Sequence, residues 1–203
     1  MYIVGGNGSI AHYNGTTWRK IESGTELTLS DIYGTNTGEV YVSGVRSSDI
    51  SGILLNGNQS GFTVVKKSGI IDSSQLFDQL YGELASVWID EKGTVYVGGN
   101  LLYWNRRGEW NYVKSLPENI LDGIPPTNFR GFISSIRGNA FNDFVIVGER
   151  NTIKHFNGIS WQQLGIEYDP NNPIDWYTVR QKENTLVAVG TIGNKATIIK
   201  LKR

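Results

Sequence analysis

The seven residues HYNGTTW (12–18) return as HFNGISW at positions 155–161. In both copies an aromatic residue precedes Asn-Gly, and a Trp follows the Gly three positions later. Asn and Gly tolerate the positive φ that tight hairpin turns need, so each copy predicts a type I′ turn between two antiparallel strands. We expect Trp18 and Trp161, which follow the turns, to pack between neighbouring repeat units.

The repeated stretch belongs to a longer unit that has three recurring anchors. The first anchor is a β-branched residue preceded by a small or polar residue. The second is the Gly that closes a Val-x-Val-Gly-like strand, and the third is an apolar residue followed by Asn, with an aromatic residue a few positions later. In chain order the anchors are Ile32, Val87, Ile136 and Val179; Gly5, Gly44, Gly98, Gly148 and Gly190; and Tyr13-Asn14, Leu55-Asn56, Trp104-Asn105 and Phe156-Asn157.

The spacing of these anchors predicts the fold class. The first anchor precedes the Gly by 12, 11, 12 and 11 residues, and the Gly precedes the Asn by 9, 12, 7 and 9 residues. Each period holds four short apolar runs separated by Gly and Asn turns, and four strands per period of roughly 40 to 50 residues are typical of propeller blades. We therefore expect an all-β chain that forms a β-propeller of about five four-stranded antiparallel blades. The alternative is a β-sandwich whose echoes are accidental.

The ends of the chain are expected to be incomplete blades. A single domain over 1–203 would hold blades at approximately 1–23, 27–67, 84–115, 132–165 and 175–203. No inner strand precedes the first blade, and the last blade stops before an outer strand. Either the chain is an excised piece of a larger ring or its ends pair in an unusual way. Open blade edges predict a homo-oligomer or a missing neighbouring segment.

The composition argues against several functional classes. Nineteen basic and 19 acidic residues leave no basic excess for nucleic acid. Cysteine is absent, so a disulfide, a thiolate zinc site and a cysteine nucleophile are excluded. No apolar run is long enough to insert into a membrane, and the start reads as the middle of a domain rather than a signal peptide. No Gly-rich loop joins a strand to a helix, and no cofactor is predicted.

The full repeat pattern, Ile-x-Gly, Val-Tyr-Val-x-Gly and Ile-x-His-Tyr-Asn-Gly-x-x-Trp, resembles the repeats of bacterial secreted propellers. It is similar to the BNR/Asp-box group and to the photosystem II assembly-factor propellers, and the Gly-Gly pairs at 5–6 and 98–99 resemble kelch blades. Nearly the whole chain takes part, but the resemblance implies the fold alone, since such propellers serve as enzymes, adhesins, receptors and scaffolds. Tyr13 and Phe156 stand where an Asp-box has its Asp, so the turn is kept and the Asp is lost.

Differences in length between repeats predict a binding face. From the outer-strand aromatic residue to the next first anchor the chain takes 14, 25, 26 and 18 residues. The insertions at 68–84, 115–131 and 165–174 would lie on one face of the disc, and their acidic and aromatic side chains suit a sugar, a basic peptide or a protein. Within them, SSQLFDQLYG (73–82) is expected to form a short helix. The predicted binding residues are Asp72, Phe77, Asp78, Tyr81, Glu118, Asp122, Phe129, Arg130, Tyr168 and Asp169.

The inner strands are expected to line a central channel. The predicted lining residues are Asp31, Tyr33, Trp88, Arg137 and Arg180. A glycoside hydrolase or lyase would need two facing carboxylates there. The candidates are Asp31 together with Asp90 and Asp175, which lie near inner-strand ends, and a sialidase-type arginine cluster would draw on Arg137 and Arg180.

No metal site is predicted. The sequences Asp90-Glu91-Lys92-Gly93 and Asp169-Pro-Asn-Asn lack the alternating ligand spacing of a calcium loop, so we interpret both as ordinary turns. His12 and His155 occupy matching places in the repeat. We expect them to be structural or surface residues rather than a metal-binding or catalytic pair.

The sequence thus predicts a non-catalytic binding or scaffold module. It would recognise a glycan, a peptide or a protein partner through the face with the long inter-blade loops. The resemblance to secreted propellers implies a bacterial, extracytoplasmic setting, either secreted or periplasmic. The alternative is a glycoside hydrolase or lyase with carboxylates at the central tunnel.

Overall fold

A computed structural model describes residues 1–35, 38–69, 80–112, 131–165, 169 and 171–202. Over these ranges the chain consists of strands and turns, and no helix in them is long and apolar enough to cross a membrane. The chain divides into two compact units, Met1–Ile89 and Asp90–Arg203. The units are described separately below, and the single domain over 1–203 stays a prediction.

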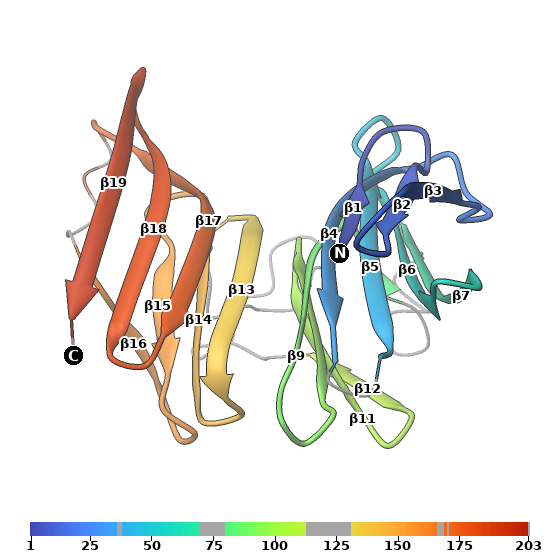
Figure 1. Cartoon of the computed structure of the whole chain (residues 1–203). Coiled ribbons are helices and arrows are strands. Elements are labelled where there is room, and N and C mark those ends of the chain that lie inside the picture. Colours follow the sequence, from blue (N-terminus) through green and yellow to red (C-terminus); the bar gives the residue numbers. More distant parts are fainter. Residues whose placement is uncertain (36–37, 70–79, 113–130, 166–168, 170, 203) are drawn as a thin grey trace, which may run out of the picture. The chain divides into compact units, whose positions relative to one another are not determined.

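The strands form five sheets, numbered here in chain order (Figure 1). Neighbouring strands are antiparallel, except that β7 and β8 pair in parallel. The first sheet holds β1 (Tyr2–Val4), β2 (Ile10–Tyr13) and β3 (Trp18–Ile21); the second β4 (Thr28–Gly34), β5 (Val40–Arg46), β6 (Ser51–Asn58), β7 (Gly61–Gly69) and β8 (Leu80–Tyr81); the third β9 (Leu84–Ile89), β10 (Val95–Gly99), β11 (Leu102–Arg106) and β12 (Glu109–Tyr112); the fourth β13 (Ile133–Ala140), β14 (Asp143–Gly148), β15 (Ile153–Phe156) and β16 (Trp161–Gln163); the fifth β17 (Ile174–Lys182), β18 (Thr185–Ile192) and β19 (Lys195–Lys202).

This arrangement confirms the predicted fold class. The chain is all-β, five sheets follow one another, and the first and last sheets have three strands each over the described residues. The helix expected at 73–82 is wrong where it can be checked, because Leu80–Tyr81 form β8, which pairs with the end of β7. Residues 73–79 lie outside the described part of the chain.

The recurring Gly has a packing reason in three sheets. In the second, fourth and fifth sheets, the anchor Gly on the second strand pairs with a first-strand residue that is followed directly by a β-bulge. The pairs are Leu29↔Gly44, Ile133↔Gly148 and Trp176↔Gly190. A Cβ built on Gly190 would lie 2.1 Å from the carbonyl oxygen of Asp175. The bulged backbone therefore leaves no room for a side chain at Gly44, Gly148 and Gly190. This reason does not extend to Gly5, where a Cβ would meet nothing within 4 Å.

Each unit has its own apolar core. In the first unit Ile10 and Ile21 of the first sheet pack with side chains of the second sheet, among them Val42 and Leu55. In the second unit Val145 and Val147 of β14 pack with Trp176 and other side chains of the fifth sheet. These faces are built from every second residue of each strand, as a half-buried sheet requires.

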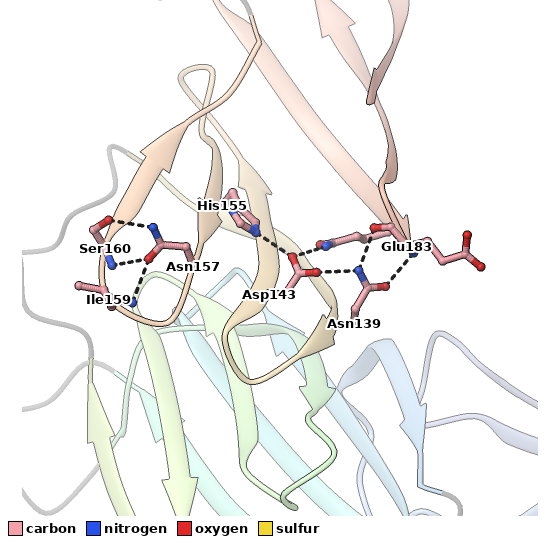
Figure 2. A network of polar contacts seen from close by, with 8 residues as sticks. Asn139, Asp143, His155, Asn157, Ile159, Ser160 and Glu183 are labelled. Atoms are coloured by element: carbon pink, nitrogen blue, oxygen red, sulfur yellow. Dashed lines mark hydrogen bonds and ion pairs between the residues drawn. The ribbon is translucent and has the colours of Figure 1, made fainter. Parts of the chain in front are cut away.

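The Asn-Gly turns differ from the predicted type I′ geometry, which needs positive φ at two successive residues. Gly15 and Gly158 have φ of 105° and 91°, whereas neither preceding Asn is in the positive-φ region. The Asn side chain instead holds the loop: Asn157 Oδ1 accepts hydrogen bonds from the backbone N of Ile159 at 2.9 Å and of Ser160 at 2.8 Å (Figure 2). Asn14 Oδ1 does the same for the two residues after Gly15. The hairpin prediction was right, and the reason given for Asn was wrong.

Candidate functional site

An aromatic groove lies in the second unit, between the third and fourth sheets. It is a cavity of about 410 Å³, within the usual size range of ligand pockets. The lining residues are Asp90, Lys92, Thr94, Tyr96, Trp104 and Arg106 from the third sheet and its first turn, and Phe141, Phe144, Phe156 and Trp161 from the fourth. We call this set the aromatic groove.

The register of the strands builds both walls of the aromatic groove. On the third sheet, Tyr96 of β10 lies directly opposite Trp104 of β11. On the fourth sheet, Phe144, Phe156 and Trp161 are successive cross-strand partners on β14, β15 and β16. Cross-strand neighbours lie side by side on one face, so each wall is a continuous row of rings.

Ring contacts fix the geometry of these rows. The Phe144 ring lies 5.3 Å from the rings of both Phe156 and Trp161, and it meets Trp161 edge-on at 89°. Tyr96 approaches Phe144 at 4.8 Å, so the two walls touch at the base of the groove. Tilted and edge-to-face pairs at these separations stabilise aromatic clusters beyond their buried area. The groove is therefore held by its own rings before any ligand enters.

The polar floor of the groove is already engaged. Asp90 is buried, and its Oδ1 accepts hydrogen bonds from the backbone N of Lys92 and of Thr94, both at 2.8 Å. Its Oδ2 lies 3.4 Å from the Tyr96 hydroxyl. Burial, and next the negative charge of Asp90, raise the pKa of Tyr96 well above its usual value of 10.0. Tyr96 therefore stays a neutral phenol that donates to the carboxylate.

Positive charge stands at the rim. Lys92 Nζ lies 3.0 Å from the centre of the Phe141 ring, a cation–π contact. The nearby carboxylate of Glu91 accepts the backbone N–H of Phe141 at 3.0 Å. Arg106 is exposed and forms no ion pair with any residue the structure describes, although Glu109 is its cross-strand neighbour. Asp90 and Glu91 are bound to backbone donors, and Arg106 is the unpaired cation among the residues that line the groove.

Among the residues that the structure describes, the matching hairpin in the first unit lines no such groove. Tyr13 and Trp18 pack ring on ring at 5.2 Å, as Phe156 and Trp161 do at 5.0 Å. Trp18 is 48% exposed, so the expectation that it packs between repeat units is wrong. A cavity of about 690 Å³ in the first unit has Tyr2 as the one aromatic residue among its described lining residues, beside Ile32, Val40 and six Gly, Thr, Asn, Gln or Ser residues. One hairpin sequence thus serves as a plain strand connection in one unit and as a groove wall in the other.

A network of polar contacts around the buried His155 supports the groove wall from behind. His155 Nε2 lies 2.8 Å from Asp143 Oδ1, which also accepts from Gln181 Nε2 at 2.6 Å. Asn139 Nδ2 donates to Asp143 Oδ2 at 2.8 Å, and its Oδ1 accepts the backbone N–H of Glu183 at 3.0 Å (Figure 2). Because a carboxylate only accepts, His155 carries its proton on Nε2. The network ties the fourth sheet to the turn after β17 and gives His155 the structural role expected for it.

Most of the predicted binding-face residues lie outside the described part of the chain. Tyr81 is a half-buried residue of β8, and Asp169 is an exposed turn residue whose Oδ1 accepts the backbone N–H of Asn171. Neither lines the aromatic groove. The predicted residues that the structure does not describe are Asp72, Phe77, Asp78, Glu118, Asp122, Phe129, Arg130 and Tyr168.

The residues predicted to line a channel make contacts within the fold. Asp31 of β4 accepts hydrogen bonds from Ser86 Oγ at 2.6 Å and from the Val87 backbone N at 3.0 Å, linking the first strands of two sheets. Trp88 is 1% exposed and belongs to the core. Arg137 and Arg180 each donate to the carbonyl of the residue before them, at 2.6 and 2.9 Å. Tyr33 is half-buried on β4, and a channel shared by all five stays a prediction.

The carboxylates considered for glycoside hydrolysis are also bound to donors. Asp31 and Asp90 are engaged as described above, and Asp175 Oδ1 accepts the backbone N–H of Arg150 at 3.1 Å. Asp90 and Asp169 each close a turn through such bonds.

Over the described ranges no group of three or more His, Asp or Glu side chains could hold a metal ion.

Sequence reasoning named some groove residues but not the groove. Trp104, Phe156 and Trp161 were repeat markers, and Trp161 was given a packing role. Tyr96 and Phe144 stand inside apolar strand stretches, where the sequence pattern gives them no binding role. The sequence does place aromatic residues on several neighbouring strands. Whether they form one row of rings depends on the strand register, which the sequence alone does not reveal.

Taken together, the successive antiparallel sheets of three to five strands define a β-propeller fold. Among solved structures the chain is similar to one described as "YCF48 bound to D1 peptide", with a TM-score of 0.60 and 12% identity. YCF48 is a photosystem II assembly factor, so that part of the expected resemblance is confirmed for the fold. The match covers all of this chain and 60% of that one. No protein-family model and no curated protein matches the sequence.

Proposed function

We propose that this protein is a recognition module that binds a peptide segment of a protein partner in the aromatic groove. The observation that carries the proposal is the pair of aromatic rows, Tyr96–Trp104 and Phe144–Phe156–Trp161, around one cavity of about 410 Å³. Aromatic side chains in a rigid pocket supply large contact area at little cost in conformational entropy, and they dominate protein interfaces.

Two further observations support a peptide over other ligands. Asp90 and Glu91, the carboxylates beside the groove, accept hydrogen bonds from backbone N–H groups. They therefore do not present a free carboxylate pair for acid–base catalysis. The similar propeller structure, YCF48, carries a D1 peptide according to its description. A propeller of this kind needs no catalytic group to work as a scaffold or assembly factor.

The test is a selection from a random peptide display library on the immobilised protein, with Trp161→Ala and Trp18→Ala as the paired variants. The two tryptophans occupy the same place in the same hairpin, but only Trp161 lines the groove. We expect peptides enriched on the wild type to bind Trp18→Ala equally. We expect Trp161→Ala to lose at least about 2 kcal/mol of binding free energy, since it removes a central aromatic anchor.

Circular dichroism and thermal unfolding of both variants provide the folding control. A peptide pool that binds the two variants equally would show that the groove is not the site. Failure to enrich any peptide from the library would contradict peptide recognition itself.

A further inference from the structure

We infer that the aromatic groove selects an extended, proline-rich segment that carries acidic residues beside its prolines. This rests on the proposed function, since it names the chemistry of the peptide that the same groove would take. Three features of the lining lead to it: ring surfaces, an excess of hydrogen-bond donors, and uncommitted positive charge.

The ring surfaces suit the pyrrolidine ring. Trp104 and Trp161 stand on opposite walls, each only partly buried, with the Tyr96–Phe144 contact between the walls. A polyproline II segment has three residues per turn and a preformed backbone, so it loses little entropy when it docks between aromatic rows. Flat rings on both sides contact successive prolines without needing a deep pocket for any one side chain.

The donor excess distinguishes proline from other apolar residues. Nitrogen donors line the groove at Lys92, Trp104, Arg106 and Trp161. The single carboxylate, Asp90, already accepts two backbone N–H groups and faces the Tyr96 hydroxyl. The lining side chains offer a peptide N–H few acceptors, the Thr94 hydroxyl among them, and an unsatisfied buried donor costs about 1–3 kcal/mol. Proline has no N–H, and its carbonyl can accept from the indole Nε1 of Trp104, which has no partner among the described residues.

The positive charges at the rim of the groove are the reason to expect acidic residues in the peptide. Lys92 and Arg106 both line the groove, whereas Asp90 and Glu91 are held by backbone donors. Because the Lys92 ammonium already forms a cation–π contact with the Phe141 ring, Arg106 is the cation of the lining that is most available to a ligand. A carboxylate on the peptide beside the prolines would pair with its guanidinium in a forked arrangement. Such a rim pair contributes specificity and salt dependence more than raw affinity.

The experiment measures fluorescence anisotropy with three labelled synthetic peptides. The first has consecutive prolines followed by glutamates, the second has alanine in place of proline, and the third has lysine in place of glutamate. We expect the first to bind at least about tenfold more tightly than either of the others. We expect Arg106→Glu to weaken the first by about tenfold and to abolish its preference over the lysine peptide. Trp104→Phe keeps an aromatic ring but removes the Nε1 donor, and it should weaken both peptides that contain proline.

Arg150→Glu is the matched control, because Arg150 is also an exposed arginine of this unit but does not line the groove. Equal binding of the proline and alanine peptides would overturn the proline requirement, and indifference to Arg106→Glu would overturn the acidic one. Selected library peptides that need Trp161 but lack proline would leave the proposed function standing and defeat this inference. A library that yields no binder at all would defeat the proposed function.

Discussion

At the scale of single residues, the two Asn-Gly turns offer a matched comparison. Gly15 and Gly158 share the same φ region, which disfavours any side chain. A Cβ on Gly158 would lie 2.6 Å from Asn142 Cβ, whereas nothing lies within 4 Å of one on Gly15. We therefore expect Gly15→Ala to lower the free energy of unfolding by about 1 kcal/mol and Gly158→Ala by about 1–3 kcal/mol. Chemical denaturation of both variants measures the difference, and equal losses would show that Asn142 gives way freely.

The Asp143 network predicts a larger residue-scale effect. Asp143→Ala removes the acceptor shared by His155, Gln181 and Asn139, and His155 has little access to replacement water because it is 7% exposed. We expect a loss of about 2–3 kcal/mol in the free energy of unfolding. Thermal unfolding of the variant tests this. The control is Asp49→Ala, because Asp49 bonds to Arg46 and Ser51 at the exposed surface.

Exposed ion pairs contribute little, so the Asp49 control should change stability by less than about 0.5 kcal/mol. Similar losses in the two variants would contradict the idea that burial makes the Asp143 network important. The sequence could place His155 in a structural role but could not find its partners. Asp143 comes from a neighbouring strand, Gln181 from β17 of the fifth sheet and Glu183 from the turn after β17, so only the folded chain brings them together.

At the scale of elements, side-chain hydrogen bonds join the first strands of adjacent sheets. Because these bonds differ in number and length, removing them should lower the free energy of unfolding by different amounts. Asp31 on β4 holds both Ser86 Oγ and the Val87 N–H of β9, while Ser135 on β13 accepts only the Val179 N–H of β17, at 3.4 Å. We expect Asp31→Ala to cost about 1–3 kcal/mol and Ser135→Ala less than about 1 kcal/mol. Urea titrations followed by tryptophan fluorescence give both values. A larger loss for Ser135→Ala would reverse this ranking.

The strands themselves were the most predictable elements. Alternation of apolar and polar residues and the spacing of Gly44, Gly148 and Gly190 are local properties, so five sheets could be foreseen from the repeat alone. The short β8 could not be foreseen in this way, because it exists through its pairing with β7 and its sequence suggested a helix. The aromatic groove was missed for the same reason: Tyr96 and Phe144 become neighbours only when two sheets pack.

At the scale of the whole molecule, the outer face of the fifth sheet predicts association. Val189 and Ile198 are cross-strand partners on β18 and β19, Ile198 is 71% exposed, and Tyr177 adds an exposed ring on β17. Sheet faces of this composition are normally covered, and contiguous exposed apolar surface marks interaction sites. We expect light scattering to show self-association that increases with protein concentration, and Ile198→Lys to weaken it. A wild-type chain that stays monomeric throughout the titration would contradict this expectation.

The tip of the second Asn-Gly turn has a practical consequence for measuring recognition. Ile159 is 92% exposed, and its backbone is fixed by Asn157 two residues from the Trp161 wall. Because the chain contains no cysteine, Ile159→Cys would introduce a unique thiol in the turn that leads to Trp161 of the groove wall. A single environment-sensitive dye attached there would convert the hairpin into an optical sensor, able to report occupancy in crude mixtures without labelling any candidate partner.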